Sequence, residues 1–189
     1  MKTVKLLSLM LGIALVTSFA ISSCKKSDNS TPPAKPTLYD SLGGTTMVSD
    51  PANAGAMIEK GRLLIRNIID STIFVIAADD SINGHFTVLL AEVTAGNLTG
   101  FEELSKNLTD FVAVGTGAKD YTYGGLSMTA AHDPAQNPRM NGKATTGGFT
   151  EFELDLVAGA GKAGVPPNTP ALGSVAKIVE SLRSTVVQQ

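Results

Sequence analysis

The segment Met128-Thr129-Ala130-Ala131-His132 ends in one of only two histidines in this chain of 189 residues. Tyr123-Gly124-Gly125 precedes it, and an amphipathic C-terminal half follows it. Met128 comes one helical turn before His132, so both side chains are expected on one face of a short helix. An imidazole placed in this way is a candidate metal ligand, or it hydrogen-bonds to a backbone carbonyl at the helix end. The flanking motifs decide between these interpretations.

Residues 1–23 have the features of a lipoprotein signal peptide. Two lysines precede an apolar run over residues 6–20, and Ile21-Ser22-Ser23 then leads to Cys24. The run is short for a helix that spans a bilayer. The sequence therefore predicts cleavage before Cys24 and lipidation of its thiol, with an uncleaved N-terminal anchor as the alternative.

Cys24 is the only cysteine, so after lipidation no thiol remains for a disulfide or a cysteine-based metal site. Lys25 follows it directly, which resembles lipoproteins sent to the outer membrane. We therefore expect a protein of the cell envelope, held by its lipid at the outer membrane. Residues 24–36 are polar and proline-rich, which is typical of a flexible tether, and residues 37–189 form one domain.

The composition excludes one class of partner and leaves the core to apolar packing. The formal net charge is only -2, which gives no electrostatic footprint for nucleic acid. Hydrophobic residues make up 43% of the chain, partly because of the signal peptide, and this is enough to build one core.

A helix is expected to begin at Thr99. Thr99 and Glu102 match a capping box, in which each side chain satisfies a free amide of the first turn. Apolar residues then recur on one face, and Gly115 and Gly117 provide the stop. The stripe consists of Phe101, Leu104, Leu108, Phe111 and Val112.

Further helices are expected on both sides of this one. Thr169-Pro170 is typical of an N-cap and first turn, and predicts a helix that continues to Val186. Shorter helices are expected over residues 149–157 and 86–93, and residues 134–148 read as a long loop. Residues 58–78 carry a helical stripe, although residues 73–76 alone would also suit a buried strand. Helix is favoured, so the domain is predicted to be all-α.

Three motifs in order resemble the truncated haemoglobins, in particular their group 1-like bacterial members. Leu38-Tyr39-Asp40-Ser41-Leu42-Gly43-Gly44 is similar to the opening of that family. Asp79 with Ile82-Asn83-Gly84-His85-Phe86 resembles the segment that ends in a haem-stacking phenylalanine. The segment from Tyr123 to His132 resembles the region of the proximal histidine, and the resemblance spans nearly all of residues 38–187.

The resemblance implies a globin-like fold of the truncated, two-over-two type, which holds one haem b (iron protoporphyrin IX). His132 would be the proximal ligand of the iron and would leave the sixth position open for a diatomic gas. The residues expected to contact the haem are Phe86, Phe101, Leu104, Phe111, Tyr123 and Met128. His85 is expected to be an exposed corner residue, with a sixth ligand or distal hydrogen-bond donor as the alternative.

The departures from the family pattern concern the distal side of the haem. A phenylalanine and tyrosine pair of the family falls on Thr72 and Ile73, and its distal glutamine falls near Phe101 or Leu104. Ser105 is the only hydroxyl nearby, so an apolar distal pocket is expected, with poorer oxygen affinity and peroxide activation. Lys106 and Lys119 are the candidates for a haem propionate.

Two classes of function follow from these observations. The first is a haem lipoprotein that reversibly binds oxygen or another diatomic gas at the cell envelope, and is not an enzyme. The second is an envelope interaction lipoprotein that kept the globin fold and lost its haem. A nitric oxide dioxygenase or peroxidase side activity remains open, although the former needs a reductase, and no redox partner is identified from the sequence.

Overall fold

Helix α2 (Lys60–Ala78) is the central element of the domain in this computed structural model, which describes residues 34–189. The predicted signal peptide and Cys24 lie outside the described residues. The stretch that suited either a helix or a strand is helical, and Ile73 and Ile76 are buried on its inner face. Helix α2 packs against α4 (Thr99–Thr116) and α6 (Thr146–Lys162), so its apolar stripe is covered from two sides.

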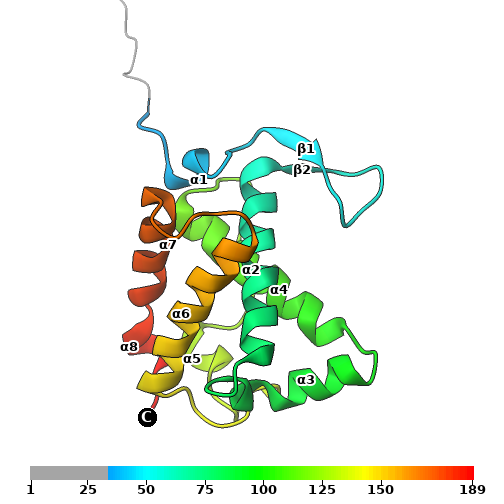
Figure 1. The fold of residues 1–189 in the computed structure, drawn as a ribbon, viewed down its shortest axis with the longest axis vertical. Helices are drawn as coiled ribbons and strands as arrows, with labels where there is room; N and C mark the ends of the chain where they lie inside the picture. Colours follow the sequence, from blue (N-terminus) through cyan, green and yellow to red (C-terminus); the bar gives the residue numbers. More distant parts are fainter. Residues whose placement is uncertain (1–33) are drawn as a thin grey trace, which may run out of the picture. The chain divides into compact units, whose positions relative to one another are not determined.

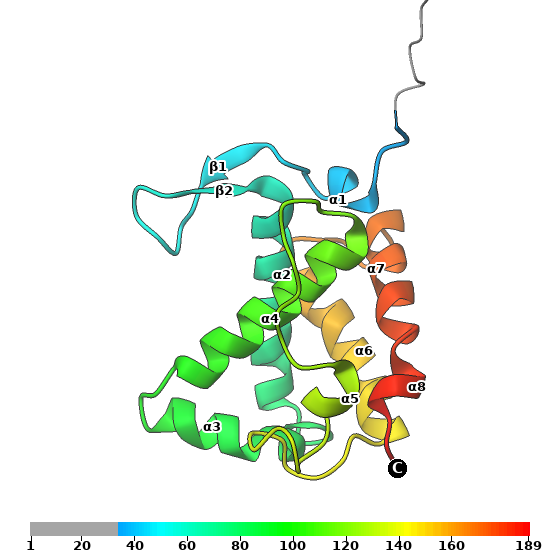
Figure 2. The same ribbon diagram turned by 180° about the vertical axis from the view of Figure 1, so that it is seen from behind.

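The helices form two stacked pairs within residues 35–189. Helix α2 crosses α4 in one pair, and α6 lies beside α7 (Pro170–Glu180) in the other (Figures 1 and 2). Contacts of α2 with α6 and of α4 with α7 join the pairs. The remaining elements are α1 (Leu38–Ser41), β1 (Met47–Ser49), β2 (Met57–Glu59), η1 (Asn83–Phe86), α3 (Thr87–Thr94), α5 (Met128–Ala131) and α8 (Arg183–Val186).

The opening motif docks the start of the domain onto α2. Tyr39 is 2% exposed, and its hydroxyl donates a hydrogen bond to Glu59 at 2.5 Å. Gly43 and Gly44 have positive φ angles, which return the chain to the start of α2. A Cβ at Gly61 would lie 2.9 Å from the Tyr39 ring, so only a glycine allows this contact.

The start of α4 lacks the capping box that was predicted for it, whereas the start of α1 has one. Thr99 is the first residue of α4, and the N-cap residue is Leu98, whose side chain makes no cap hydrogen bond, so the predicted capping box is wrong. The side chain of Asn97 accepts from the Thr99 amide instead, at 3.1 Å. A capping box does occur at α1, between Thr37 and Asp40.

Other boundaries were shifted by local signals. Thr145 caps α6, so this helix begins at Thr146. The long loop therefore ends at residue 145, three residues before its predicted end at residue 148. Thr169 caps α7 as predicted, but that helix ends at Glu180 and α8 follows separately.

A short hairpin is the one departure from an all-α domain in the described part. Strands β1 and β2 pair antiparallel, with Val48 opposite Ile58. Asp50 lies in the hairpin loop and pairs with Arg66 of α2 at 2.6 Å. The strands have three residues each, too few for a recognisable alternation of apolar and polar residues.

Within residues 34–189, no single helix combines the length and apolar character needed to cross a membrane. Helix α2 and the segment Asn83–Thr94 meet the criterion only together, and they are bent by 105° with respect to each other.

The two helix pairs approach each other closely at Gly159 of α6. A Cβ there would lie 2.3 Å from the hydroxyl oxygen of Thr72 and 2.6 Å from its backbone nitrogen. The Thr72 hydroxyl is already committed, since it donates to the Ile68 carbonyl at 2.8 Å. Backbone cannot yield as a flexible side chain does, so a larger residue must push α2 and α6 apart.

We predict that Gly159→Ala lowers the free energy of unfolding by about 2 kcal/mol or more, because the added methyl overpacks this crossing. Gly161→Ala is the matched control in the same helix, because nothing lies within 4 Å of its added Cβ. The control should be neutral or stabilising by up to about 1 kcal/mol. Urea unfolding measures both, and equal stability of the two variants would contradict the packing account.

Candidate cofactor site

Helix α5 places His132 at its C-terminal end. The Ser127 hydroxyl caps the helix start by accepting from the Ala130 amide at 3.2 Å. At the other end, Asn137 donates to the Ala131 carbonyl at 2.7 Å, which ties the following loop to the helix. The short helix is thereby held at both ends, and His132 leaves it in a defined direction.

The imidazole of His132 is held in one tautomer. Its Nδ1 lies 2.7 Å from the Met128 carbonyl oxygen, and because a carbonyl only accepts, Nδ1 carries the proton. Nε2 then has a free electron pair, and no group within residues 34–189 hydrogen-bonds to it. Burial lowers the pKa of the ring, against an opposing effect of the carbonyl. The neutral form is therefore present at pH 7, as a metal ligand requires.

A cavity of about 230 Å³ lies beside this imidazole. Helices α2, α4, α6, α7 and α8 contribute to its wall, together with η1, α3 and the start of α5. Apart from His85, His132 and Gly148, every lining residue is an alanine or a larger apolar residue. The interior is therefore dry and suited to a large apolar ring.

A second cavity, of about 390 Å³, adjoins the first and has a polar mouth. Glu103, Asn107, Tyr123 and Arg139 lie in its wall. Seven residues line both cavities: Phe86, Leu89, Leu104, Leu108, Met128, His132 and Met140. An apolar interior that adjoins a polar mouth matches a porphyrin, whose ring is apolar and whose carboxylates are charged, so the residues present fit this group.

The structure brings all the predicted contact residues to these cavities. Phe101 and Phe111 line the inner cavity, and Tyr123 lines the outer one, while Phe86, Leu104, Met128 and His132 line both. The Tyr123 hydroxyl donates to the Leu126 carbonyl at 2.5 Å, so this side chain offers its ring and not its hydroxyl. That these residues contact a haem stays a prediction.

Sequence reasoning missed three residues that line both cavities. Leu108 had a signal, because it lies one helical turn after Leu104 on the stripe of α4. Leu89 lies in α3 and is buried, but that helix has only eight residues to show a pattern. Met140 comes from the irregular loop after His132, where no periodicity marks the residues that turn inward.

The distal residues agree with the expected lack of hydroxyls in the inner cavity. Ile73 lines it, whereas Thr72 is turned towards α6 and is not among the lining residues. The hydroxyl of Ser105 donates to Asp70 of α2 at 2.5 Å and does not line either cavity.

His85 is not the exposed corner residue that we expected. It is half-buried and lines the inner cavity, and its Nδ1 lies 3.1 Å from the Asn141 carbonyl oxygen. Nε2 is directed at the start of α6, because a Cβ on Gly148 would lie 3.2 Å from it. The ring is thus fixed between η1, the loop after His132 and α6.

The predicted propionate partners lie elsewhere. Lys106 forms an ion pair with Asp110 at 2.7 Å, and neither Lys106 nor Lys119 lines a cavity. Arg139 lines the outer cavity instead. It lies in the loop after His132, seven residues along the chain, and sequence reasoning gave it no role.

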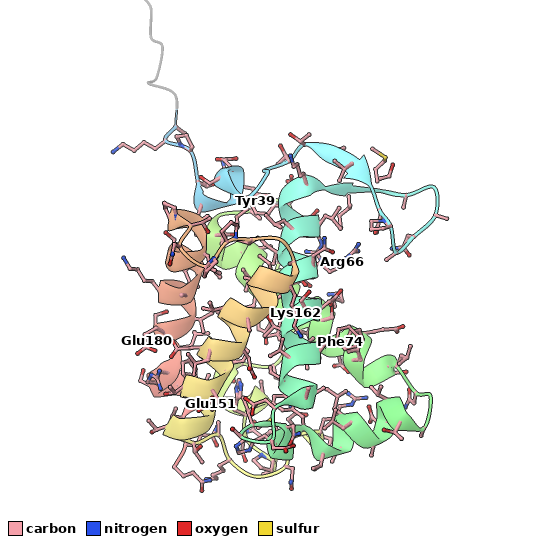
Figure 3. All side chains as sticks on the ribbon, viewed as in Figure 1. Tyr39, Arg66, Phe74, Glu151, Lys162 and Glu180 are labelled. Atoms are coloured by element: carbon pink, nitrogen blue, oxygen red, sulfur yellow. The ribbon has the colours of Figure 1, made fainter. Side chains whose placement is uncertain are left out.

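An aromatic pair lies at the edge of the inner cavity. The rings of Phe74 in α2 and Phe101 in α4 are 5.5 Å apart between centroids, and both line the cavity. Phe74 is 63% exposed, and Figure 3 shows it on the side of α2 next to α4. The apolar lining therefore reaches the surface here.

No group of three or more His, Cys, Asp or Glu side chains in the described part of the chain is arranged to hold a bare metal ion. One imidazole suits an iron whose other in-plane ligands come from a porphyrin.

A solved structure shares this fold. The crystal structure of a truncated haemoglobin from Tetrahymena pyriformis, a mutant in the Fe(III) form, superposes with a TM-score of 0.56. The match covers 82% of this chain and all of that protein, at 19% sequence identity. The fold is that of a truncated haemoglobin. No protein-family model and no curated protein sequence matches the chain.

Proposed function

We propose that this chain binds one haem b through His132 and reversibly binds a diatomic gas such as oxygen, nitric oxide or carbon monoxide. The observation that carries the proposal is a neutral, half-buried imidazole beside an apolar cavity, with its Nδ1 held by the Met128 carbonyl. When bound, the haem supplies an iron with one coordination position left for a gas.

The chain's own residues would hold the porphyrin and keep water away from it. Phe86, Leu104 and Met128 offer apolar surface on different elements around His132. Burial of the ring between them is favourable at about 25 cal/mol per Å² of apolar area removed from water. The hydrogen bond from Nδ1 makes Nε2 a better donor of its electron pair and fixes the plane of the imidazole.

The apolar wall of the cavity also determines how firmly a bound gas would be held. Ile73 and Phe101 provide no hydrogen bond for a gas that carries partial negative charge, so oxygen should be released readily and peroxide activated poorly. We propose a carrier, scavenger or sensor of gas and not an enzyme, since repeated turnover with nitric oxide needs an electron partner.

The place of action rests on the sequence before the described residues. We propose that Cys24 is lipidated and that residues 24–36 tether the domain to the outer membrane of the cell envelope. A gas ligand crosses bilayers freely, so a domain at this site would meet it without a transporter.

Haem reconstitution of the full chain should give a Soret band, because His132 offers a preformed axial ligand. The His132→Ala variant should lose or strongly shift this band, since the ligand is removed. His85→Ala is the comparison variant, because it removes the other histidine of the cavity, and its Soret band should persist. Carbon monoxide should shift the band of the reduced wild-type protein.

Three results of this spectroscopy would count against the proposal. The Soret band could be absent, it could be unchanged in His132→Ala, or it could depend on His85 instead. Slow release of oxygen from the reduced protein would separately contradict the account of the apolar distal wall.

The Cys24→Ala variant should lose acyl labelling and membrane retention, because the acceptor thiol is gone. Labelling with a fatty-acid analogue and fractionation of the cells measure both. Ser23→Ala is a control that keeps the thiol and a small residue before it, and it should be labelled normally. Acyl labelling that persists in Cys24→Ala would rule out the lipoprotein assignment.

A further inference from the structure

Arg139 occupies a singular position at the mouth of the site. Among the described residues that line the two cavities, it is the only lysine or arginine. Lys106, the nearest alternative from the sequence, is held by Asp110 and lines neither cavity. A carboxylate at the edge of a bound porphyrin would therefore meet a single cationic group in the wall.

Two carboxylates hold the Arg139 guanidinium in place. Its Nε donates to Glu92 of α3, with oxygen distances of 3.2 and 3.1 Å, and its Nη1 donates to Glu103 of α4 at 2.8 Å. The hydrogen bonds found within residues 34–189 use only Nε and Nη1. Because a guanidinium has five N–H donors, Nη2 remains available for a further acceptor.

The two carboxylates differ in how firmly they are held. The Glu92 side chain is 24% exposed, whereas that of Glu103 is 58% exposed. An ion pair with an exposed partner contributes little to stability, so a ligand carboxylate can replace Glu103 at little cost. Glu92 would remain as the positioning residue that keeps the guanidinium at the mouth.

Backbone packing supports this geometry. A Cβ on Gly100 would lie 2.2 Å from the Glu92 Oε2 atom and 2.8 Å from Arg139 Nε. The ion pair thus rests directly on the first turn of α4, where only a glycine leaves room for it.

Arg139 is also fixed relative to His132. The side chain of Asn137 accepts from the Arg139 amide at 3.1 Å and donates to the Ala131 carbonyl at 2.7 Å. The Asn137 amide in turn donates to the Asp133 carbonyl at 2.8 Å. One segment, residues 128–139, therefore carries both the imidazole and the guanidinium at a set separation.

We propose that Arg139 binds a propionate carboxylate of the porphyrin, in exchange with Glu103, and so secures the cofactor that His132 ligates. The inference rests on the proposed haem function. It assigns the charged end of the ligand to the loop after His132, and not to Lys106 or Lys119. The bidentate geometry of a guanidinium and a carboxylate favours a defined orientation of the porphyrin in the cavity.

The test compares haem with its dimethyl ester, in which both propionate carboxylates are esterified and uncharged. Each is bound to the full chain in detergent, and its loss to an excess of a competing haem acceptor is timed. Wild-type protein should lose the ester about tenfold faster than haem, because the ester lacks the charge-assisted bond. Arg139→Gln should lose haem about tenfold faster than wild type, with ester loss unchanged.

Two variants separate this role from a purely structural one. Glu103→Gln removes the competing carboxylate and should slow haem loss at least about twofold. If the Arg139–Glu103 ion pair only stabilised the loop, the same variant would speed haem loss. Lys119→Ala, which lines neither cavity, should match wild type with both porphyrins.

The possible failures are distinguishable. If Arg139→Gln speeds the loss of both porphyrins equally, or of neither, the propionate assignment is wrong and the haem function stands. If Glu103→Gln speeds haem loss, the exchange with Glu103 is wrong. If wild-type protein takes up neither porphyrin, the proposed function fails and this inference fails with it.

Discussion

The hydrogen bond from His132 Nδ1 to the Met128 carbonyl is the contact on which the account of the site depends. At 2.7 Å, it selects the tautomer, sets the plane of the ring and leaves Nε2 as the reactive nitrogen. It exists because α5 is so short that its C-terminal carbonyls have no helical partners. The histidine at the helix end uses one of these carbonyls, so a requirement of the backbone also orients the candidate ligand.

The surrounding fold places that nitrogen beside an apolar cavity. Helix α2 approaches α6 closely at Gly159 and α4 on its other side, and the cavity lies where these helices meet the end of α5. A wall of apolar side chains lowers the pKa of His132 by burial, and apart from His85 and His132 the same wall offers no polar side chain. In the proposed haem protein, ligand strength and weak oxygen retention would both follow from this apolar environment.

Apart from His85 and His132, the polar side chains of the site lie at its mouth. Glu92, Glu103 and Arg139 come from three separate segments and meet over the first turn of α4. This division into a dry interior and a charged rim allows a ligand with one apolar and one anionic end to enter in a single orientation.

The sequence predicted the parts of this structure that depend on short-range patterns. The stripe from Phe101 to Val112 identified α4, Thr169 identified the cap of α7, and the segment ending in His132 identified the candidate ligand. Its failures have physical causes. Thr99 and Glu102 have the spacing of a capping box, but the side chain of Asn97 accepts from the Thr99 amide instead. Several polar side chains compete for the free amides at one helix start.

Arg139 was missed, and His85 was misjudged, for a different reason. Both are placed by contacts between segments that are distant in the chain, Arg139 by Glu92 and Glu103 and His85 by the Asn141 carbonyl. No local pattern carries that information. The loop between His132 and Thr145 is therefore the part of the site that only the structure could assign.

Resonance Raman spectroscopy of the ferrous, haem-loaded full chain tests the central claim most directly, because it detects the bond between iron and imidazole. The account predicts an iron–histidine stretching band that shifts on labelling of histidine with ¹⁵N, disappears in His132→Gly and returns when free imidazole is added to that variant. A band that is absent from the wild-type protein, or that survives unchanged in His132→Gly, would contradict it.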